Sequence, residues 1–131
     1  MESFTWNEKL KIGVESVDKQ HMTILTYLEK SYNLVSERSS NVIVKELLDE
    51  MRAHSQTHFT FEENLMLINN HPTIYNHVKQ HEIFIEKIDN CKYSCITREM
   101  GVMQKELLEM KAWLMNHILE FDKLYLEHFY I

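Results

Sequence analysis

Turn-forming residues are scarce in this chain, which has two glycines, Gly13 and Gly101, and one proline, Pro72, among 131 residues. A β-sandwich, a β-barrel or a doubly wound sheet needs many tight turns, and glycine and proline supply many of the backbone conformations that such turns require. The scarcity therefore favours a few long helices joined by short loops.

Four segments repeat apolar or histidine side chains at intervals of three and four residues, the spacing that aligns side chains on one face of a helix. We expect the first helix to span about residues 17–37, with Ser16 as its N-cap. Residues 1 to about 15 would form an N-terminal arm anchored by Phe4 and Trp6. The recurring positions are Val17, His21, Leu25, Leu28, Tyr32 and Val35 in the first segment; Leu47, Met51, His54, His58, Phe61 and Leu65 in the second; Ile74, His77, Val78, His81, Phe84, Ile85 and Ile88 in the third; and Met103, Leu107, Met110, Leu114, His117, Phe121 and Leu124 in the fourth.

The connections between these segments are short. Polar residues 36–41 would separate the first two helices, Pro72 would open the third, and a polar loop near residues 91–98 would precede the fourth. Short connections place successive helices antiparallel. The sequence therefore predicts an all-α fold, an up-down-up-down antiparallel four-helix bundle with an N-terminal arm, in a single domain of residues 1–131.

Composition excludes several function classes. Acidic residues outnumber basic ones by 20 to 14, and the resulting charge of −6 at pH 7 disfavours nucleic acid as a partner. The longest apolar runs, residues 65–68 and 112–115, are too short to span a bilayer, so no membrane insertion is expected. The N-terminus lacks the basic and apolar regions of a secretory signal, which favours a cytoplasmic protein. Cys91 and Cys95 offer no disulfide framework and are interpreted as ordinary cysteines.

Histidines are the unusual feature of the predicted core. The chain has eight, and five of them fall on the inward faces of the four helices: His21, His58, His77, His81 and His117. A buried polar group without a partner costs about 1 to 3 kcal/mol, so five unpartnered imidazoles would weaken the core severely. A bound metal ion would remove that cost.

The spacing of these residues supports a metal site. His58 and Glu62 lie one helical turn apart, as do His77 and His81, so each pair can converge on one centre. His117 and Asp122 are five residues apart, a separation that directs them to different sides of a regular α-helix. A widened turn, a π-bulge, would bring Asp122 back beside His117.

Other metal sites lack their motifs. No glutamate lies three residues before any histidine, so the E-x-x-H pairs of ferritin-like di-iron bundles are absent, and there is no H-E-x-x-H sequence. Zinc at Cys91 and Cys95 would need further ligands that the sequence does not offer nearby.

At these residues the chain resembles the hemerythrin family, and specifically its single-domain bacterial members. The resemblance covers nearly the whole chain and runs through Trp6, Gly13, residues 18–21, 58–63 and 77–81, and residues 113–118 to Asp122. It implies two non-haem iron ions per chain joined by an oxo or hydroxo bridge. It also implies the ligands: His77, His81 and His117 on one iron, His21 and His58 on the other, and Glu62 and Asp122 bridging both.

This ligand set leaves one coordination position empty. Two octahedral ions offer about twelve positions, and the five imidazoles, two bridging carboxylates and bridging oxygen fill about eleven. The vacancy lies on the iron with two histidines, where the family binds dioxygen. The family's apolar oxygen pocket would comprise Trp113, Leu114 and Ile118. Neutral imidazoles stabilise high-valent iron less than carboxylates do, which favours carrying dioxygen over consuming it.

Four other residues receive separate predictions. His71 and His128 are expected to be solvated, and Glu63 to be a surface charge because it points about 100° away from Glu62. His54 is interpreted either as a satisfied core histidine or as a hydrogen-bond partner of a metal ligand.

The leading hypothesis is reversible dioxygen binding for storage, transport or delivery, without enzymatic activity. We expect a monomer whose partners are dioxygen and an oxygen-consuming enzyme. The alternatives are sensing of, or protection against, oxygen, nitric oxide or redox change through the same irons, and a peroxidase-like or iron-repair activity. A chain of 131 residues leaves little room for the output domain that a sensor needs.

Overall fold

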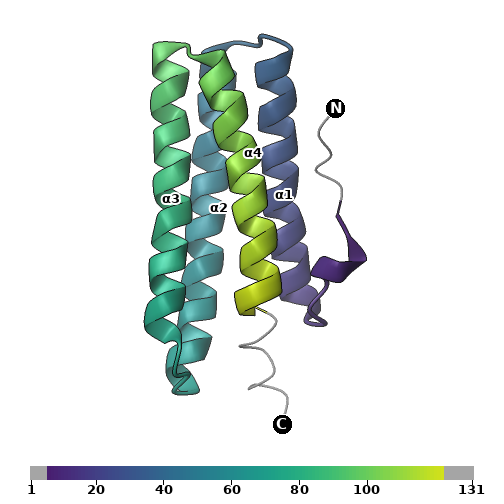
Figure 1. The fold of residues 1–131 in the computed structure, drawn as a ribbon, viewed down its shortest axis with the longest axis vertical. Helices are drawn as coiled ribbons and strands as arrows, with labels where there is room; N and C mark the ends of the chain where they lie inside the picture. The colour runs from purple at the N-terminus through teal and green to yellow at the C-terminus, as the bar shows by residue number, and fades with distance from the viewer. Residues whose placement is uncertain (1–5, 123–131) are drawn as a thin grey trace.

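The computed structural model describes residues 6–122 and contains a bundle of four α-helices. Its elements are, in order, η1 (Glu8–Leu10), α1 (Glu15–Ser36), α2 (Asn41–Ile68), α3 (Ile74–Thr97), α4 (Met100–His117) and the π-helical segment η2 (Ile118–Asp122). Successive helices run in opposite directions (Figure 1). Helix α1 packs against α2 and α4, and α3 packs against the same two helices. The predicted fold class, an antiparallel four-helix bundle, is confirmed.

Within the described residues, the N-terminal arm lies on the outside of the bundle beside α1 (Figure 1). Trp6 packs against the core as predicted, whereas Phe4 lies outside the described residues. The sequence analysis missed a second anchor, Leu10, which is only 3% exposed. Part of the arm is thus held by apolar packing within the described chain.

Helix α1 begins earlier than predicted, and Ser16 is not its N-cap. The helix starts at Glu15, after Val14 in the N-cap position. The buried carboxylate of Asp18 accepts hydrogen bonds from the backbone N–H groups of Ile12 at 2.9 Å and Gly13 at 3.2 Å. Because this carboxylate binds the amides of the preceding segment, the arm is tied directly to the first helical turn.

Helix α2 is rotated relative to the predicted pattern. The expected core residue Phe61 is 42% exposed, whereas Phe59 is 1% exposed and packs in the core. The predicted spacing of alternating threes and fours has a period of 3.5 residues, and a straight helix drifts away from it by about 20° per heptad. The buried face therefore passes through Ser55, Phe59 and Glu62.

The prediction of a polar loop near residues 91–98 is also wrong for most of that range. Helix α3 continues to Thr97, and Cys91, Ser94 and Cys95 extend its buried face. Burial raises the pKa of the Cys91 thiol to about 12, so the thiol stays protonated at neutral pH. The two cysteines are free and act as core residues, as interpreted from the sequence.

The three interhelical turns share one backbone conformation, which explains how the chain turns with so little glycine. A residue with left-handed φ ends each of the first three helices: Arg38 at 56°, Asn70 at 52° and Arg98 at 59°. The next N–H then bonds back to a carbonyl five residues earlier, as from Ser39 to Leu34 at 2.9 Å. None of these turns uses glycine.

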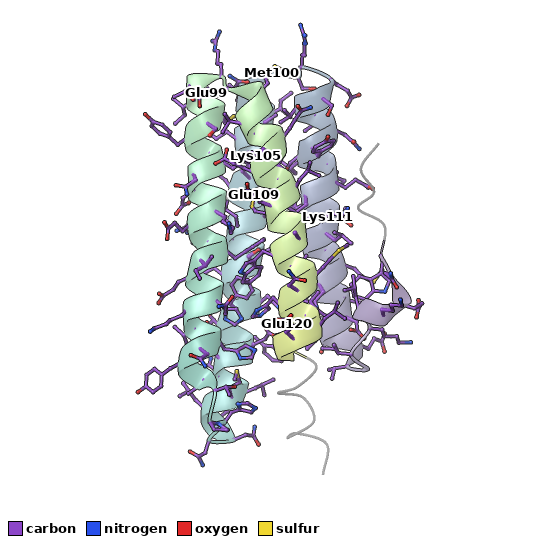
Figure 2. The ribbon with its side chains drawn as sticks, viewed as in Figure 1. Glu99, Met100, Lys105, Glu109, Lys111 and Glu120 are labelled. Atoms are coloured by element: carbon purple, nitrogen blue, oxygen red, sulfur yellow. The ribbon has the colours of Figure 1, made fainter. Side chains whose placement is uncertain are left out.

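Charged side chains are distributed along α4 and at both of its ends. Figure 2 labels Glu99 at one end, Lys105, Glu109 and Lys111 along the helix, and Glu120 at the other end. Among residues 6–122, no helix combines the length and apolar character needed to cross a membrane.

Replacement of Asp18 by alanine tests the attachment of the arm. The variant should lose about 1 to 3 kcal/mol of unfolding free energy, because two backbone N–H groups lose their acceptor. The matched control is Glu15→Ala, since Glu15 lies in the same turn and makes only an exposed ion pair with Lys19. It should change stability by less than about 0.5 kcal/mol. Urea unfolding measures both, and an equal loss in the two variants would contradict the assigned role of Asp18.

Candidate metal centre

Seven buried polar side chains converge near the end of the bundle where α1 and α3 begin. They form overlapping groups whose ligand atoms lie within 4.8 Å of one another. One group is His77, His81 and His117; a second is His21, His58 and Glu62; a third joins Glu62 and His117 to Asp122. The structure thus brings together all seven residues that the sequence analysis named as ligands.

Each carboxylate lies against histidines of both groups. Glu62 Oε1 is 3.2 Å from His58 Nε2 and 3.4 Å from His81 Nε2. Asp122 Oδ2 is 3.1 Å from His21 Nε2, while Asp122 Oδ1 is 3.2 Å from His117 Nε2 and 3.4 Å from His77 Nε2. Each carboxylate therefore contacts histidines of both groups.

The expected widened turn after His117 is confirmed. Residues Ile118–Asp122 form a π-helical segment directly after α4. The wider turn returns Asp122 to the face that carries His117, and the Asp122 side chain is fully buried there. Without the additional residue, helical geometry would direct Asp122 away from the centre.

Two histidines are oriented by partners outside the centre. His58 Nδ1 donates to the side-chain oxygen of Gln20, and His81 Nδ1 donates to Glu63 Oε2 at 2.7 Å. In the singly protonated form of each ring the proton therefore lies on Nδ1, which leaves the lone pair of Nε2 facing the centre. The prediction that Glu63 is merely a surface charge is wrong: it does point away from Glu62, but its carboxylate reaches a histidine of α3.

The role of Gln20 was not predicted, since its contact with His58 joins two helices and has no spacing signal within one helix. His54 is not a core histidine, because its side chain is only half-buried. Its Nε2 lies 3.2 Å from the backbone oxygen of Gln20, so it contacts the residue that orients His58.

His71 is also placed differently from the prediction. Its side chain is 6% exposed, and its Nδ1 accepts a hydrogen bond from the backbone N–H of Thr73 at 3.2 Å. His71 lies in the turn between α2 and α3, and its Nδ1 holds Thr73, the residue that precedes α3. The other histidine expected to be solvated, His128, lies outside the described residues, as does Leu124.

Aromatic rings pack on the histidines of the three-histidine group. Phe59 stacks on His81 with ring centres 3.9 Å apart and planes inclined by 4°. Trp113 stacks on His117 at 4.5 Å and 10°, and Phe84 packs on the indole at 4.8 Å. Phe59 was missed because the predicted rotation of α2 placed Phe61 in the core instead.

The residues predicted to form an apolar pocket lie beside the centre. Leu114 is 2% exposed and Ile118 is fully buried, while Trp113 is half-buried. These residues supply apolar surface next to His117.

The charges of the centre stabilise one another. Burial raises the pKa of Glu62 and Asp122, but the facing histidines outweigh it, so the pKa of each carboxyl lies below its ordinary value. Burial lowers the pKa of His81, but Glu62 and Glu63 more than compensate and raise it to about 9. Burial, together with the nearby positive charge of His81, lowers the pKa of His117 although Asp122 and Glu62 oppose the shift. The metal-free centre therefore keeps its carboxylates ionised beside partly protonated imidazoles.

The donor atoms fit metal ions better than they fit one another. His21 Nε2, His58 Nε2 and Asp122 Oδ2 are buried and have no partner with hydrogen-bond geometry, although the distances between neighbouring atoms are short. Buried nitrogen and carboxylate oxygen atoms that converge while several of them lack a hydrogen bond are typical of a metal site.

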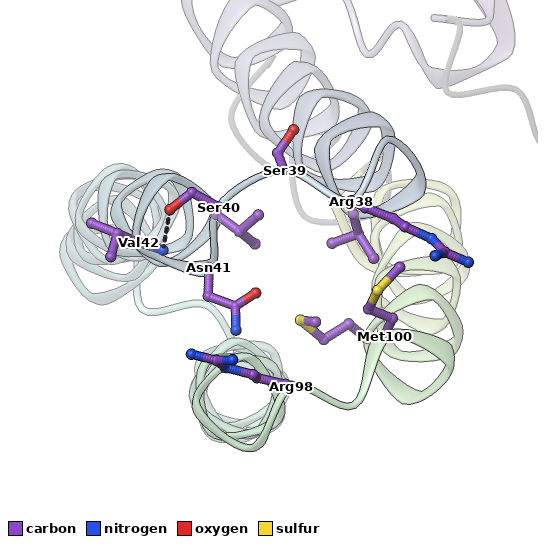
Figure 3. Close-up of a pocket in the computed structure, with 10 residues that line it drawn as sticks. Arg38, Ser39, Ser40, Asn41, Val42, Arg98 and Met100 are labelled. Carbon is purple, nitrogen blue, oxygen red and sulfur yellow. Dashed lines mark hydrogen bonds between the residues drawn. The ribbon is translucent and has the colours of Figure 1, made fainter.

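A cavity of about 380 Å³ at the opposite end of the bundle is a separate feature (Figure 3). Apolar residues of the bundle, including Val35 and Met103, line it together with Arg38 and Arg98. It lacks a group of histidines and carboxylates among the described residues and lies away from the seven converging side chains.

Comparisons with known proteins agree with this geometry. Residues 12–129 match the family described as "Hemerythrin HHE cation binding domain". The bacteriohemerythrin of Stenotrophomonas maltophilia is 30% identical over 95% of this chain and 80% of its own length. That of Clostridium acetobutylicum is 22% identical over 95% and 99%, and the myohemerythrin of Theromyzon tessulatum is 24% identical over 89% and 86%.

Glu62 and Glu63 provide an internal test of the centre. Glu62→Gln should abolish binding of a pair of metal ions, because it removes the charge that lies between His58 and His81. Glu63→Gln should keep two ions at saturating metal, because Glu63 contacts only the outer nitrogen of His81. Elemental analysis of the metal-loaded variants measures the difference. Equal loss of metal from both would show that the two carboxylates are wrongly assigned.

Proposed function

The chain belongs to the hemerythrin family of non-haem iron, dioxygen-binding proteins, and we propose that it binds dioxygen reversibly at a di-iron centre for storage, transport or delivery. The observation that carries the proposal is the convergence of five imidazoles and two carboxylates from four helices in one buried site. Delivery would be to an oxygen-consuming enzyme.

The proposed ligands follow the two groups of side chains. His77, His81 and His117 would hold one iron, His21 and His58 would hold the other, and Glu62 and Asp122 would bridge them, together with an oxo or hydroxo group. Bound iron would supply one electron per ion to dioxygen and recover both on release. Support comes from the position of each carboxylate, which lies within 3.4 Å of histidines from both groups.

The surrounding residues favour binding over consumption of dioxygen. Leu114, Ile118 and Trp113 would form an apolar wall that excludes water and external acids from the ligand pocket. The five neutral imidazoles also favour a carrier, since carboxylate-rich centres better stabilise the oxidised iron that oxygenases use. We therefore propose a binding protein rather than an enzyme.

Metal content and reversibility test the proposed function together. The purified chain should hold two irons and no haem, and the visible spectrum of the reduced protein should change on exposure to air and return when oxygen is removed, over many cycles. Net oxygen consumption or rapid conversion to the diferric form would instead indicate an enzyme. One zinc with little iron, in protein made with ample iron, would refute the di-iron centre.

Two histidines one turn apart on α2 provide the matched control for this experiment. His58→Asn removes a proposed ligand and should lower the iron content below two per chain. His54→Asn changes a half-buried histidine outside the centre and should leave two irons bound.

Leu114 tests the apolar wall. Leu114→Ala should open a route for solvent and small anions, so the oxygenated form should convert to diferric protein faster while the iron content stays near that of wild type. Because Leu114 is only 2% exposed, the variant should also lose about 2 to 5 kcal/mol of stability. Stopped-flow and long-term spectra measure the autoxidation rate.

Leu107→Ala is the control, since Leu107 is fully buried on the same helix but seven residues further from the centre. It should cost similar stability without faster autoxidation. An unchanged rate in fully metallated Leu114→Ala would place Leu114 in the ordinary core.

A further inference from the structure

One histidine of the centre is held at both ring nitrogens by consecutive residues of α2. Glu62 Oε1 lies 3.4 Å from His81 Nε2, and Glu63 Oε2 lies 2.7 Å from His81 Nδ1. Successive residues of a helix point about 100° apart, so the two carboxylates reach opposite sides of the ring. Glu62 belongs to the candidate centre, whereas Glu63 lies outside it and is 24% exposed at its side chain.

Stacking alone does not determine which edge of His81 faces the centre. Phe59 holds the ring plane, with 4° between the two rings. A 180° rotation of the imidazole about its Cβ–Cγ bond would preserve that stacking but would turn carbon atoms toward both the centre and Glu63. The contacts at the two ring nitrogens distinguish the two orientations, and the contact with Glu63 is the shorter of the two carboxylate contacts and the one made from outside the centre. As an acceptor, Glu63 also keeps a proton on Nδ1.

The two-histidine group has a neutral counterpart of this contact. His58 Nδ1 donates to the side-chain amide oxygen of Gln20, which orients the ring but carries no net charge. A carboxylate acceptor gives a stronger, charge-assisted hydrogen bond and makes the imidazole a better electron donor. The two halves of the centre therefore differ in the charge that supports their histidines as well as in the number of histidines.

We propose that Glu63 is a positioning residue that fixes the orientation and tautomer of His81 and makes the three-histidine half of the centre the stronger metal site. The inference rests on the proposed di-iron function for its metal, but the hydrogen bond itself exists in the metal-free chain. Removal of residues that orient a ligand in this way typically lowers metal affinity by about 10- to 100-fold.

Two substitutions distinguish the effect of a hydrogen-bond acceptor at residue 63 from the effect of its negative charge. Glu63→Gln leaves a neutral acceptor, like that of Gln20, whereas Glu63→Leu leaves none. The matched control is Glu82→Gln, which removes the same charge from an exposed side chain next to His81 in sequence. Circular dichroism establishes that each variant is folded.

The first measurement uses the metal-free protein. The spectra are recorded above the His81 pKa of about 9, where the ring carries a single proton and nitrogen chemical shifts distinguish the two tautomers. Wild type, Glu63→Gln and Glu82→Gln should then show His81 protonated at Nδ1. Glu63→Leu should show a mixture. An unaltered His81 spectrum in Glu63→Leu would overturn the proposal.

The second measurement uses Zn²⁺, which is diamagnetic, in competition with a chelator. The ring signals of His81 report the three-histidine half, and those of His21 report the other half. Affinity at His81 should fall by about 10-fold in Glu63→Gln and by up to about 100-fold in Glu63→Leu, with less than a twofold change at His21. Affinity within twofold of wild type in Glu63→Leu, or an equal loss in Glu82→Gln, would overturn the proposal.

These results are independent of the proposed function. A wild-type chain that bound no pair of irons, or did not release dioxygen, would refute that function, while the His81 tautomer in the metal-free variants would still decide the role of Glu63.

Discussion

Mutual charge compensation among buried side chains is the interaction on which this structure depends. Five imidazoles and two carboxylates occupy the interior of a bundle that is otherwise built from residues such as Leu28, Leu48 and Ile88. Burial opposes the charged form of each group, yet facing histidines hold the pKa values of Glu62 and Asp122 below their ordinary range. Removal of the histidines that face a carboxylate would leave that charge buried with less compensation, so the charged members of the centre stabilise one another.

The antiparallel arrangement of the helices brings these seven side chains to one end of the bundle. Helices α1 and α3 begin at the same end of the bundle, and their first halves carry proposed ligands (Figure 1). The other proposed ligands lie in the second half of α2, at the end of α4 and in η2, and these segments run toward that same end. The apolar core and both cysteines occupy the remaining length. The cavity at the far end, with its two arginines, is separate from this chemistry.

Residues around the proposed ligands make the histidines unequal. Phe59 and Trp113 stack on His81 and His117, which limits the planes that these rings can adopt. A carboxylate supports His81, whereas an amide supports His58. Since hydrogen bonds to a ligand tune its basicity and orientation, the two halves of one centre receive different support from the protein.

Helical periodicity and residue spacing predicted the fold class, the inward faces that carry the five histidines and the π-helical turn before Asp122, because these depend on positions along single helices. The full set of seven proposed ligands came from the resemblance to the hemerythrin family. Reasoning from periodicity failed for Phe61, since a 3.5-residue pattern drifts against a 3.6-residue helix, and for the length of α3, since Cys91 and Cys95 continue its buried face despite their polar neighbours. The roles of Gln20, Glu63 and Asp18 are contacts to other helices or to the arm. Such contacts depend on how helices are rotated and paired in space, which no spacing along one segment specifies, so only the tertiary structure decided them.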